Sequence, residues 1–289
     1  MEQFSVLNLR RLDGGRRDGG FGEVYLGERS DTGVTVIVKY LVEGGIFEYR
    51  EQFAREVRVL AAAVHPGVVR VLGWNLADPR PFYVMPYIRG GALSKHAGNL
   101  SNRDVLAWGA QIATALAAMH AQELIHGDVK PDNVLMDGAE LRVSDPLGNG
   151  AGCTISFGTK WGGTPGYMSP ELLDGWPISK EADVFAFGAT LFHLATGTHP
   201  DGHVLDAKYH RANVDIELHN IILACAAPQP WMRPTMAQVH QRLVARWSAM
   251  PKPQVRVAPP PPPNPIAALI GVAAVALLGV GIASVLSGK

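Results

Sequence analysis

Cysteine and net charge are both scarce in this chain. Of its 289 residues only 2 are cysteine, Cys153 and Cys225, so no disulfide framework is expected and a reducing compartment fits. The 26 basic and 26 acidic side chains give a formal net charge of +0, so no overall electrostatic field is expected to attract nucleic acid. The 10 histidines show no metal-ligand spacing, and the N-terminus lacks an apolar run long enough for a signal peptide.

A long apolar run does occur near the C-terminal end of the sequence. Residues 266–286, IAALIGVAAVALLGVGIASVL, carry no charge and are apolar on every face of a helix. Such a helix spans about 30 Å, the thickness of a bilayer's hydrocarbon core. Arg246, Lys252 and Arg256 precede it, which favours a cytoplasmic N-terminal side. The sequence predicts a single-pass, tail-anchored membrane protein, compatible with a bacterial inner membrane; a buried soluble helix is the alternative.

Proline is concentrated in a linker that precedes this run. Residues 249–265 include the consecutive prolines 259–263, which favour a polyproline II conformation. This conformation makes a semi-rigid spacer between a folded domain and the membrane. A ligand for a proline-binding module, at residues 259–265, is the alternative interpretation.

Residues 1–248 form the globular part, and their patterns change near residue 87. Residues 1–87 predict a small β-rich lobe with one helix, whose apolar face carries Phe53, Val57 and Leu60. Residues 88–248 predict a larger helical lobe, so the expected fold is α+β with two lobes. Strands are expected at 21–28, 34–40, 68–74 and 81–87, and helices at 48–64, 105–121, 183–197 and 235–247.

A glycine-rich segment and a lysine indicate a phosphate site in the small lobe. RDGGFGEVYLG, residues 17–27, lies between two expected strand segments, where glycines let backbone N–H groups approach phosphate oxygens. Lys39 follows on the next strand, in TVIVKYL. It could hold phosphates if a carboxylate on the following helix, of which Glu56 is the natural candidate, kept it in place. A glycine-rich hairpin and a snorkelling lysine are the alternatives.

A second group of polar residues surrounds the segment HGDVKPDN, residues 126–133. Asp128 could orient an attacking hydroxyl and accept its proton. Lys130 could neutralise charge on a transferred phosphoryl group, and the amide oxygen of Asn133 could bind Mg²⁺. Asp145, in VSDPLG, adds a second oxygen ligand in a loop after a strand. Two ordinary polar turns are a poor alternative for this spacing.

Together these segments resemble the signature of the eukaryotic-like serine/threonine protein kinase family, in order, over nearly all of residues 9–247. GGTPGYMSPE, residues 162–171, resembles the end of the family's activation segment, and Asp183 and Arg233 match two anchors of the large lobe. In the family that arginine pairs with the glutamate corresponding to Glu171. The resemblance implies that Met85 lies behind an adenine pocket, with backbone groups near Pro86 and Ile88 binding adenine.

The implied reaction is transfer of the γ-phosphoryl group of ATP, with Mg²⁺ or alternatively Mn²⁺, to Ser or Thr hydroxyls of proteins. By this resemblance Asn133 and Asp145 bind the metal. Thr164 marks the serine/threonine class and contacts the catalytic aspartate and lysine. The implied catalytic residues are Asp128, Lys130, Lys39, Glu56 and Thr164. The implied nucleotide-binding residues are Gly19, Gly20, Phe21, Gly22, Val24, Lys39, Met85, Pro86, Ile88, Lys130, Asn133 and Asp145.

The sequence departs from the family's pattern at three positions. Arg17 replaces the first glycine of the loop, and Pro146 with Leu147 replaces the Phe of the metal-binding motif. Gly127 replaces the arginine that meets a phosphorylated activation loop, so no activating role is expected for Thr154, Ser156 or Thr159. These departures keep a second hypothesis open, a membrane-tethered pseudokinase that binds ATP and acts as a scaffold. A small-molecule phosphotransferase of related fold is a third. The sequence does not specify the substrate, the activating signal or the oligomeric state.

Overall fold

The computed structural model describes residues 2–3, 9–12, 17–19, 22–41, 47–146, 164–200 and 205–251. The expected transmembrane helix and residues 252–265 of the linker lie outside these residues. None of the helices in the described ranges is both long and apolar enough to cross a membrane. Internal contacts group residues Met1–Met250 into one compact unit.

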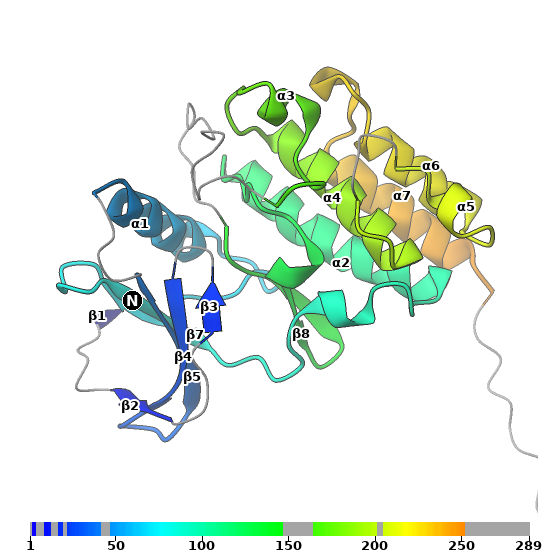
Figure 1. The fold of residues 1–289 in the computed structure, drawn as a ribbon. Helices are drawn as coiled ribbons and strands as arrows, with labels where there is room; N and C mark the ends of the chain where they lie inside the picture. The colour runs from blue at the N-terminus through cyan, green and yellow to red at the C-terminus, as the bar shows by residue number, and fades with distance from the viewer. Residues whose placement is uncertain are drawn as a thin grey trace, which may run out of the picture. The chain divides into compact units, whose positions relative to one another are not determined.

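The first lobe is built on a 7-stranded sheet with the order β1-β6-β7-β5-β4-β2, and β3 also pairs with β4 (Figure 1). The strands are antiparallel, except that β1 and β6 run parallel. β-branched and aromatic residues fill the central strands, as a half-buried pleated surface favours. The strands are β1 Glu2–Gln3, β2 Leu9–Arg11, β3 Arg17–Gly19, β4 Gly22–Arg29, β5 Thr35–Leu41, β6 Gly73–Asn75 and β7 Phe82–Pro86.

In the part of this lobe that the structure describes, one long helix is present, α1 (Phe47–Ala62). Its expected apolar face is confirmed, since Phe53, Val57 and Leu60 are all at most 3% exposed. The ring of Phe53 lies 5.5 Å from that of Tyr83 on β7, which packs the helix against the sheet. This packing sets the position of Glu56, on the turn between Phe53 and Leu60.

The expected strand at residues 68–74 is wrong over most of its length, because only Gly73–Asn75 pairs within the sheet. The preceding valines form a buried connector. The N–H of Val68 donates to His65 in a turn, and that of Val69 donates to Val143 in the other lobe. Val68, Val69 and Val71 are at most 3% exposed. Their apolar pattern therefore reflects burial between the lobes and not a strand.

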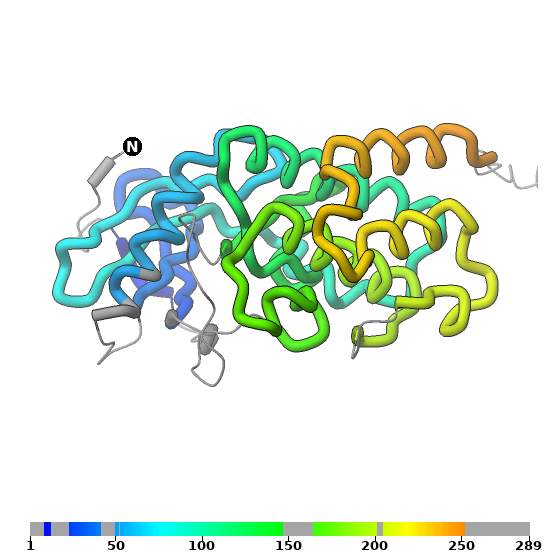
Figure 2. The backbone as a smooth tube through the Cα atoms, turned by 90° about the horizontal axis from the view of Figure 1, so that it is seen from above, coloured from blue at the N-terminus to red at the C-terminus, as the bar shows by residue number. Residues whose placement is uncertain are grey.

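The second lobe is helical, and its centre is α4, whose residues are buried on nearly all sides. α2 lies beside α7, as the ribbon of Figure 1 and the backbone tube of Figure 2 show. Gly109 of α2 permits close packing, because a Cβ there would lie 2.8 Å from Leu191 and 3.4 Å from Leu243. The α-helices are α2 Asn102–Ala121, α3 Pro170–Leu173, α4 Lys180–Thr196, α5 Ala207–His210, α6 Ile216–Cys225 and α7 Met236–Ala249. The described residues of this lobe also include the 3-10 turns Leu93–His96, Pro131–Asn133 and Pro230–Met232 and the hairpin of β8 (Val134–Asp137) and β9 (Glu140–Val143).

An ion pair joins two segments of this lobe near α3. Arg233 donates to both carboxylate oxygens of Glu171, at 2.6 and 2.8 Å, with side-chain exposures of 0% and 7%. The guanidinium also donates to the carbonyls of Ala227, Glu181 and Pro228. Every N–H group of the Arg233 guanidinium therefore donates a hydrogen bond. The buried positive charge is paired with a carboxylate and also hydrogen-bonded to backbone carbonyls.

Candidate active site

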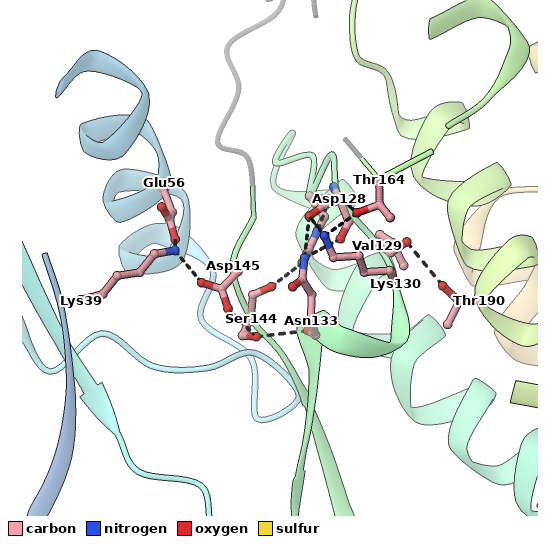
Figure 3. A network of polar contacts seen from close by, with 11 residues as sticks. Lys39, Glu56, Asp128, Val129, Lys130, Asn133, Ser144, Asp145, Thr164 and Thr190 are labelled. Atoms are coloured by element: carbon pink, nitrogen blue, oxygen red, sulfur yellow. Dashed lines mark hydrogen bonds and ion pairs between the residues drawn. The ribbon is translucent and has the colours of Figure 1, made fainter. Parts of the chain in front are cut away.

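Lys39 on β5 connects the two lobes. Its Nζ lies 2.6 Å from Oε1 of Glu56 on α1 and 2.6 Å from Oδ1 of Asp145, which follows β9 (Figure 3). The pairing with Glu56 expected from the sequence is therefore present. Side-chain exposures are 9% for Lys39 and 7% for Glu56, whereas Asp145 remains 35% exposed. The carboxylate of Asp145 is thus the part of this triad that a ligand could reach.

The pKa values in this triad follow from burial and from mutual charge. Burial alone would lower the pKa of Lys39, but the carboxylates of Asp145 and Glu56 outweigh it and raise that pKa. Burial would raise the pKa of Asp145, yet the ammonium group of Lys39 holds it below the ordinary value. Burial also raises the pKa of Glu56, against the attraction of Lys39. Lys39 and Asp145 are accordingly charged at neutral pH.

Asp128 is the centre of a second cluster in the larger lobe. Lys130 Nζ lies 2.6 Å from Oδ2 of Asp128 and 2.6 Å from Oγ1 of Thr164 (Figure 3). Asn133 Nδ2 donates to the same Oδ2, at 2.8 Å, and to the Asp128 carbonyl, also at 2.8 Å. Oγ1 of Thr164 lies 3.5 Å from Oδ1 of Asp128. These four expected site residues are therefore brought together.

Buried polar groups below this cluster fix its backbone. Asp183, which is 1% exposed, accepts hydrogen bonds from the backbone N–H groups of His126 and Gly127, at 2.8 and 2.7 Å. Its carboxylate also lies 2.8 Å from Nε2 of His120. Gly127 has a φ of 80°, in the left-handed region that favours glycine. A side chain at this position would therefore be strained in the backbone conformation seen here.

His126 links the two clusters, a role that the sequence did not reveal. Its Nδ1 accepts from the N–H of Asp128, at 3.2 Å, so Nε2 carries the hydrogen and donates to the carbonyl of Ser144, at 2.9 Å. Burial lowers the pKa of His126, which keeps the ring neutral. One side chain thereby fixes the distance between the loops that carry Asp128 and Asp145.

Asp145 is held in an uncommon backbone conformation. Its φ is 55°, which a non-glycine residue rarely adopts, and Pro146 follows it. Contacts of Ser144 help to hold Asp145 in this conformation, because its Oγ lies 3.1 Å from Asp145 Oδ2 and 3.2 Å from the Asn133 carbonyl oxygen. Strain that the surroundings maintain is frequent at functional sites. The second residue of the Pro146-Leu147 departure lies outside the described residues.

The donor chemistry near Asn133 and Asp145 fits a hard divalent cation. Asp145 contributes a partly exposed carboxylate, and Asn133 turns its amide nitrogen toward Asp128. Among the described residues nothing donates a hydrogen bond to Oδ1 of Asn133, so this oxygen is available as a ligand. Carboxylate and amide oxygens are the ligands that Mg²⁺ prefers in proteins.

The expected nucleotide-binding residues of the small lobe are described in part. Val24 on β4 stands directly opposite Lys39 on β5, and Gly19 pairs with Gly22 in the β3–β4 hairpin. Met85 is 6% exposed and stands opposite Ile37, on the same sheet face as Lys39. Pro86 ends β7, and Ile88 is 8% exposed just beyond it. Gly20 and Phe21 lie outside the described residues.

Tyr83 is another residue of this site that the sequence did not reveal. It is fully buried on β7, and its hydroxyl donates to Oε1 of Glu56 at 2.7 Å. The same oxygen accepts from Lys39. Tyr83 and Lys39 stand opposite each other in neighbouring strands, so register places both beside Glu56. In the sequence, Tyr83 has apolar neighbours, as most buried aromatic residues do. The hydrophobic pattern therefore does not indicate that it belongs to the site.

Comparison with known proteins gives one family match and many relatives. The model of the protein kinase domain matches residues 17–245. CBL-interacting serine/threonine-protein kinase 10 of Arabidopsis thaliana is 30% identical over 83% of this chain and 55% of its own length. Serine/threonine-protein kinase PknK of Mycobacterium bovis is 34% identical over 74% of this chain and 19% of its own. A leaf rust 10 disease-resistance locus receptor-like protein kinase-like 1.3 of Arabidopsis thaliana is 32% identical over 72% of this chain and 31% of its own. The chain therefore covers at most 55% of the length of any of these three relatives.

Proposed function

Because the chain belongs to the protein kinase family, and two of the relatives above are named serine/threonine-protein kinases, we propose that it transfers the γ-phosphoryl group of ATP to serine and threonine hydroxyls of proteins. The observation that carries this proposal is the convergence of two clusters. Lys39, Glu56 and Asp145 form one, and Asp128 with Lys130 forms the other. His126 joins them through the loops that carry Asp128 and Asp145.

Each side chain in these clusters has a task that its contacts support. The carboxylate of Asp128 orients the attacking hydroxyl and accepts its proton. Lys130, already bonded to Asp128 and Thr164, balances the charge that develops on the transferred group. Asn133 and Asp145 would hold Mg²⁺, which would neutralise phosphate charge when it is bound. Lys39, fixed by Glu56, binds phosphate oxygens in exchange for part of its contact with Asp145.

This function is tested by transfer of label from γ-labelled ATP to a generic basic protein, followed by identification of the labelled amino acid. Label on serine or threonine is expected, and it depends on Mg²⁺. Label on a small alcohol such as choline or an aminoglycoside, with none on protein, would instead indicate a small-molecule phosphotransferase. Nucleotide binding without any transfer would indicate the scaffold that the departures at Arg17 and Pro146 keep open.

Tyr83 offers a test of how Glu56 is positioned. Tyr83→Phe removes a hydrogen bond to a buried carboxylate, a change of about 1.5 kcal/mol, and so should lower kcat/KM for ATP about tenfold. Initial rates measured while ATP is varied would show the loss. Tyr209→Phe is the matched control, because Tyr209 is 83% exposed on α5 of the other lobe and should tolerate the change. Equal rates for Tyr83→Phe and wild type would show that Glu56 does not need this bond.

We further propose a division of the chain into a kinase domain at residues 1–248, a proline-rich spacer at 249–265 and a membrane span at 266–286. The uncharged sequence of the last segment supports the span, and the preceding basic residues support a cytoplasmic kinase domain. The spacer would let the kinase reach protein substrates near the membrane.

Deletion of residues 257–289 should move the protein from the membrane fraction to the soluble fraction, because the apolar run is lost. Fractionation after an alkaline wash and immunoblotting would measure this. Deletion of residues 257–264 alone is the control and should leave the protein in the membrane fraction. A full-length chain found in the soluble fraction would contradict the anchor.

A further inference from the structure

A cavity of about 300 Å³, here called the outer cavity, adjoins β2, β4 and β5 of the first lobe, which are neighbours in the sheet (Figure 1). Tyr25 on β4 stands opposite Val38 on β5, whereas Lys39 stands opposite Val24. Because side chains alternate between the two faces of a strand, Tyr25 and Val38 point away from the face that carries Lys39. The outer cavity is lined by Leu9–Arg11, Tyr25–Gly27, Val38, Tyr40 and Arg80.

The bottom of the outer cavity is apolar. Val38 is 4% exposed and belongs to a buried cluster with Val36, against which Leu9 packs. Gly27 stands opposite Val36 and adds no side chain to this face, where a Cβ would lie 3.2 Å from Cγ2 of Val38. The absence of a side chain at position 27 leaves the space beside Val38 to a ligand.

Two tyrosines and two arginines form the walls of the outer cavity. The rings of Tyr25 and Tyr40 meet edge-on, with their centroids 5.7 Å apart. Cζ of Arg11 lies 3.9 Å from the centroid of the Tyr25 ring, and Cζ of Arg80 lies 4.9 Å from that of Tyr40. Walls of this kind favour a planar apolar group that packs against the rings beside a positive charge.

The charges at the outer cavity leave one cation without an acidic partner. Arg10 pairs with Glu28 at 2.9 Å, and Arg80 pairs with Glu23. Arg11 is exposed, and its guanidinium forms no ion pair or hydrogen bond with the residues that the structure describes. One unpaired guanidinium suits a carboxylate, which it can bind through two parallel hydrogen bonds. A doubly charged phosphate is less favourable, because the carboxylates of Glu23 and Glu28 would repel it more strongly.

We propose that the outer cavity binds an aromatic carboxylic acid, with its ring against Tyr25 and Tyr40 and its carboxylate bound by Arg11. The volume lies at the lower end of the range for ligand pockets, so a ligand with a single ring is favoured. A free aromatic acid and the C-terminal phenylalanine of a polypeptide present the same chemistry. This site is separate from the proposed kinase function, because it takes no group from either catalytic cluster.

The first test is an NMR titration of the full-length chain with 3-phenylpropanoate, for which a Kd of about 1 mM is expected. Two matched probes separate the contributions of charge and ring. The amide 3-phenylpropanamide keeps the ring without the charge, and propanoate keeps the charge without the ring. Each should bind about tenfold more weakly or less. Equal affinities for the acid and the amide, or no binding of the acid at about 10 mM, would overturn the proposal.

Arg11→Gln should weaken the binding of 3-phenylpropanoate about tenfold and leave that of the amide unchanged, because only the acid uses the guanidinium. Arg58→Gln is the matched control. Arg58 is exposed on α1, which packs through Phe53 and Tyr83 against the other face of the sheet, so its variant should bind like wild type. Wild-type affinity for the acid in Arg11→Gln would contradict the assignment.

Saturating Mg-ATP should leave the Kd of 3-phenylpropanoate unchanged, because Lys39 and the outer cavity lie on opposite faces of β5. Displacement by Mg-ATP would place the probe in the nucleotide site and overturn the proposal. None of these measurements requires phosphoryl transfer, so a chain without kinase activity would count against the proposed function and not against this site.

The peptide Gly-Gly-Phe with a free C-terminal carboxylate distinguishes the two sources of the ligand. Tighter binding of this peptide than of 3-phenylpropanoate would assign the site to the C-terminus of a polypeptide, and weaker binding would assign it to a free acid. The same peptide with an amidated C-terminus is the control and should bind about tenfold more weakly than the free peptide. Equal binding of the two peptides, together with equal binding of the acid and its amide, would show that Arg11 holds no carboxylate.

Discussion

Asp128→Asn should lower kcat about a thousandfold, because the amide can neither accept the hydroxyl proton nor supply the negative charge that orients Lys130. Asparagine has almost the same shape as aspartate, so the cluster should remain assembled. ATP binding should change little, since no contact with the nucleotide is assigned to this carboxylate. Steady-state phosphorylation of a serine peptide would measure the rate, and calorimetry with Mg-ATP would measure the binding.

A control from the same lobe separates lost chemistry from lost structure. Asp137→Asn also removes one carboxylate, but Asp137 is 47% exposed in the β8–β9 hairpin and pairs only with Arg142 among the ion pairs of the described residues. Its kcat should stay within about a factor of two of wild type, as surface changes usually do. An Asp128→Asn protein with nearly full activity would remove the general-base role from the proposed mechanism.

Arg233→Leu should cost about 4 kcal/mol of unfolding free energy, the largest stability effect that we expect from a single substitution. The variant leaves the carboxylate of Glu171 buried without its cation. It also removes the hydrogen bonds that Arg233 donates to three backbone carbonyls. Urea unfolding followed by fluorescence would measure it. The double variant Arg233→Leu/Glu171→Leu should recover part of the loss, because no unpaired charge remains.

The ion pair also predicts an acid dependence. Burial alone would raise the pKa of Glu171, but the hydrogen bonds from Arg233 outweigh it and lower that pKa from 4.5. A lowered pKa in the folded state stabilises the protein above about pH 4.5, and this contribution disappears as the pH falls through the folded-state value. The single Arg233→Leu variant should lack that part of the acid destabilisation. Arg10→Leu breaks the exposed ion pair with Glu28. This variant should lose less than about 1 kcal/mol of unfolding free energy and should retain the acid destabilisation of the wild type. A loss for Arg233→Leu as small as that of Arg10→Leu would contradict the structural role of the pair.

Spacing and residue type were sufficient to predict much of this site. A lysine on a strand and a glutamate on the next helix face were expected to meet, and Lys39 and Glu56 do. Helical periodicity predicted the buried face of α1, because Phe53, Val57 and Leu60 repeat at the period of a helix. These are local signals, so they can be read within one element or between neighbouring ones.

Long-range polar contacts were not predictable in this way. Tyr83 looks like an ordinary core residue in the sequence, and the spacing of the motif that His126 begins does not show what its ring contacts. Only the register of β5 with β7 and the packing of two loops give these residues their partners. The run of valines after His65 was misinterpreted for the same reason, because burial between two lobes leaves the same apolar pattern as a buried strand. The close approach of Gly166 to the carbonyl of Pro200 depends likewise on backbone packing that no spacing rule predicts.

The most direct test of the central claim is a crystal structure of the chain with Mg²⁺ and a non-hydrolysable ATP analogue. The terminal phosphate should lie between Lys39 and Lys130, with the metal bound to oxygens of Asn133 and Asp145 and the carboxylate of Asp128 facing the phosphate across an open acceptor position. A nucleotide bound elsewhere, or a metal that contacts neither Asn133 nor Asp145, would contradict it.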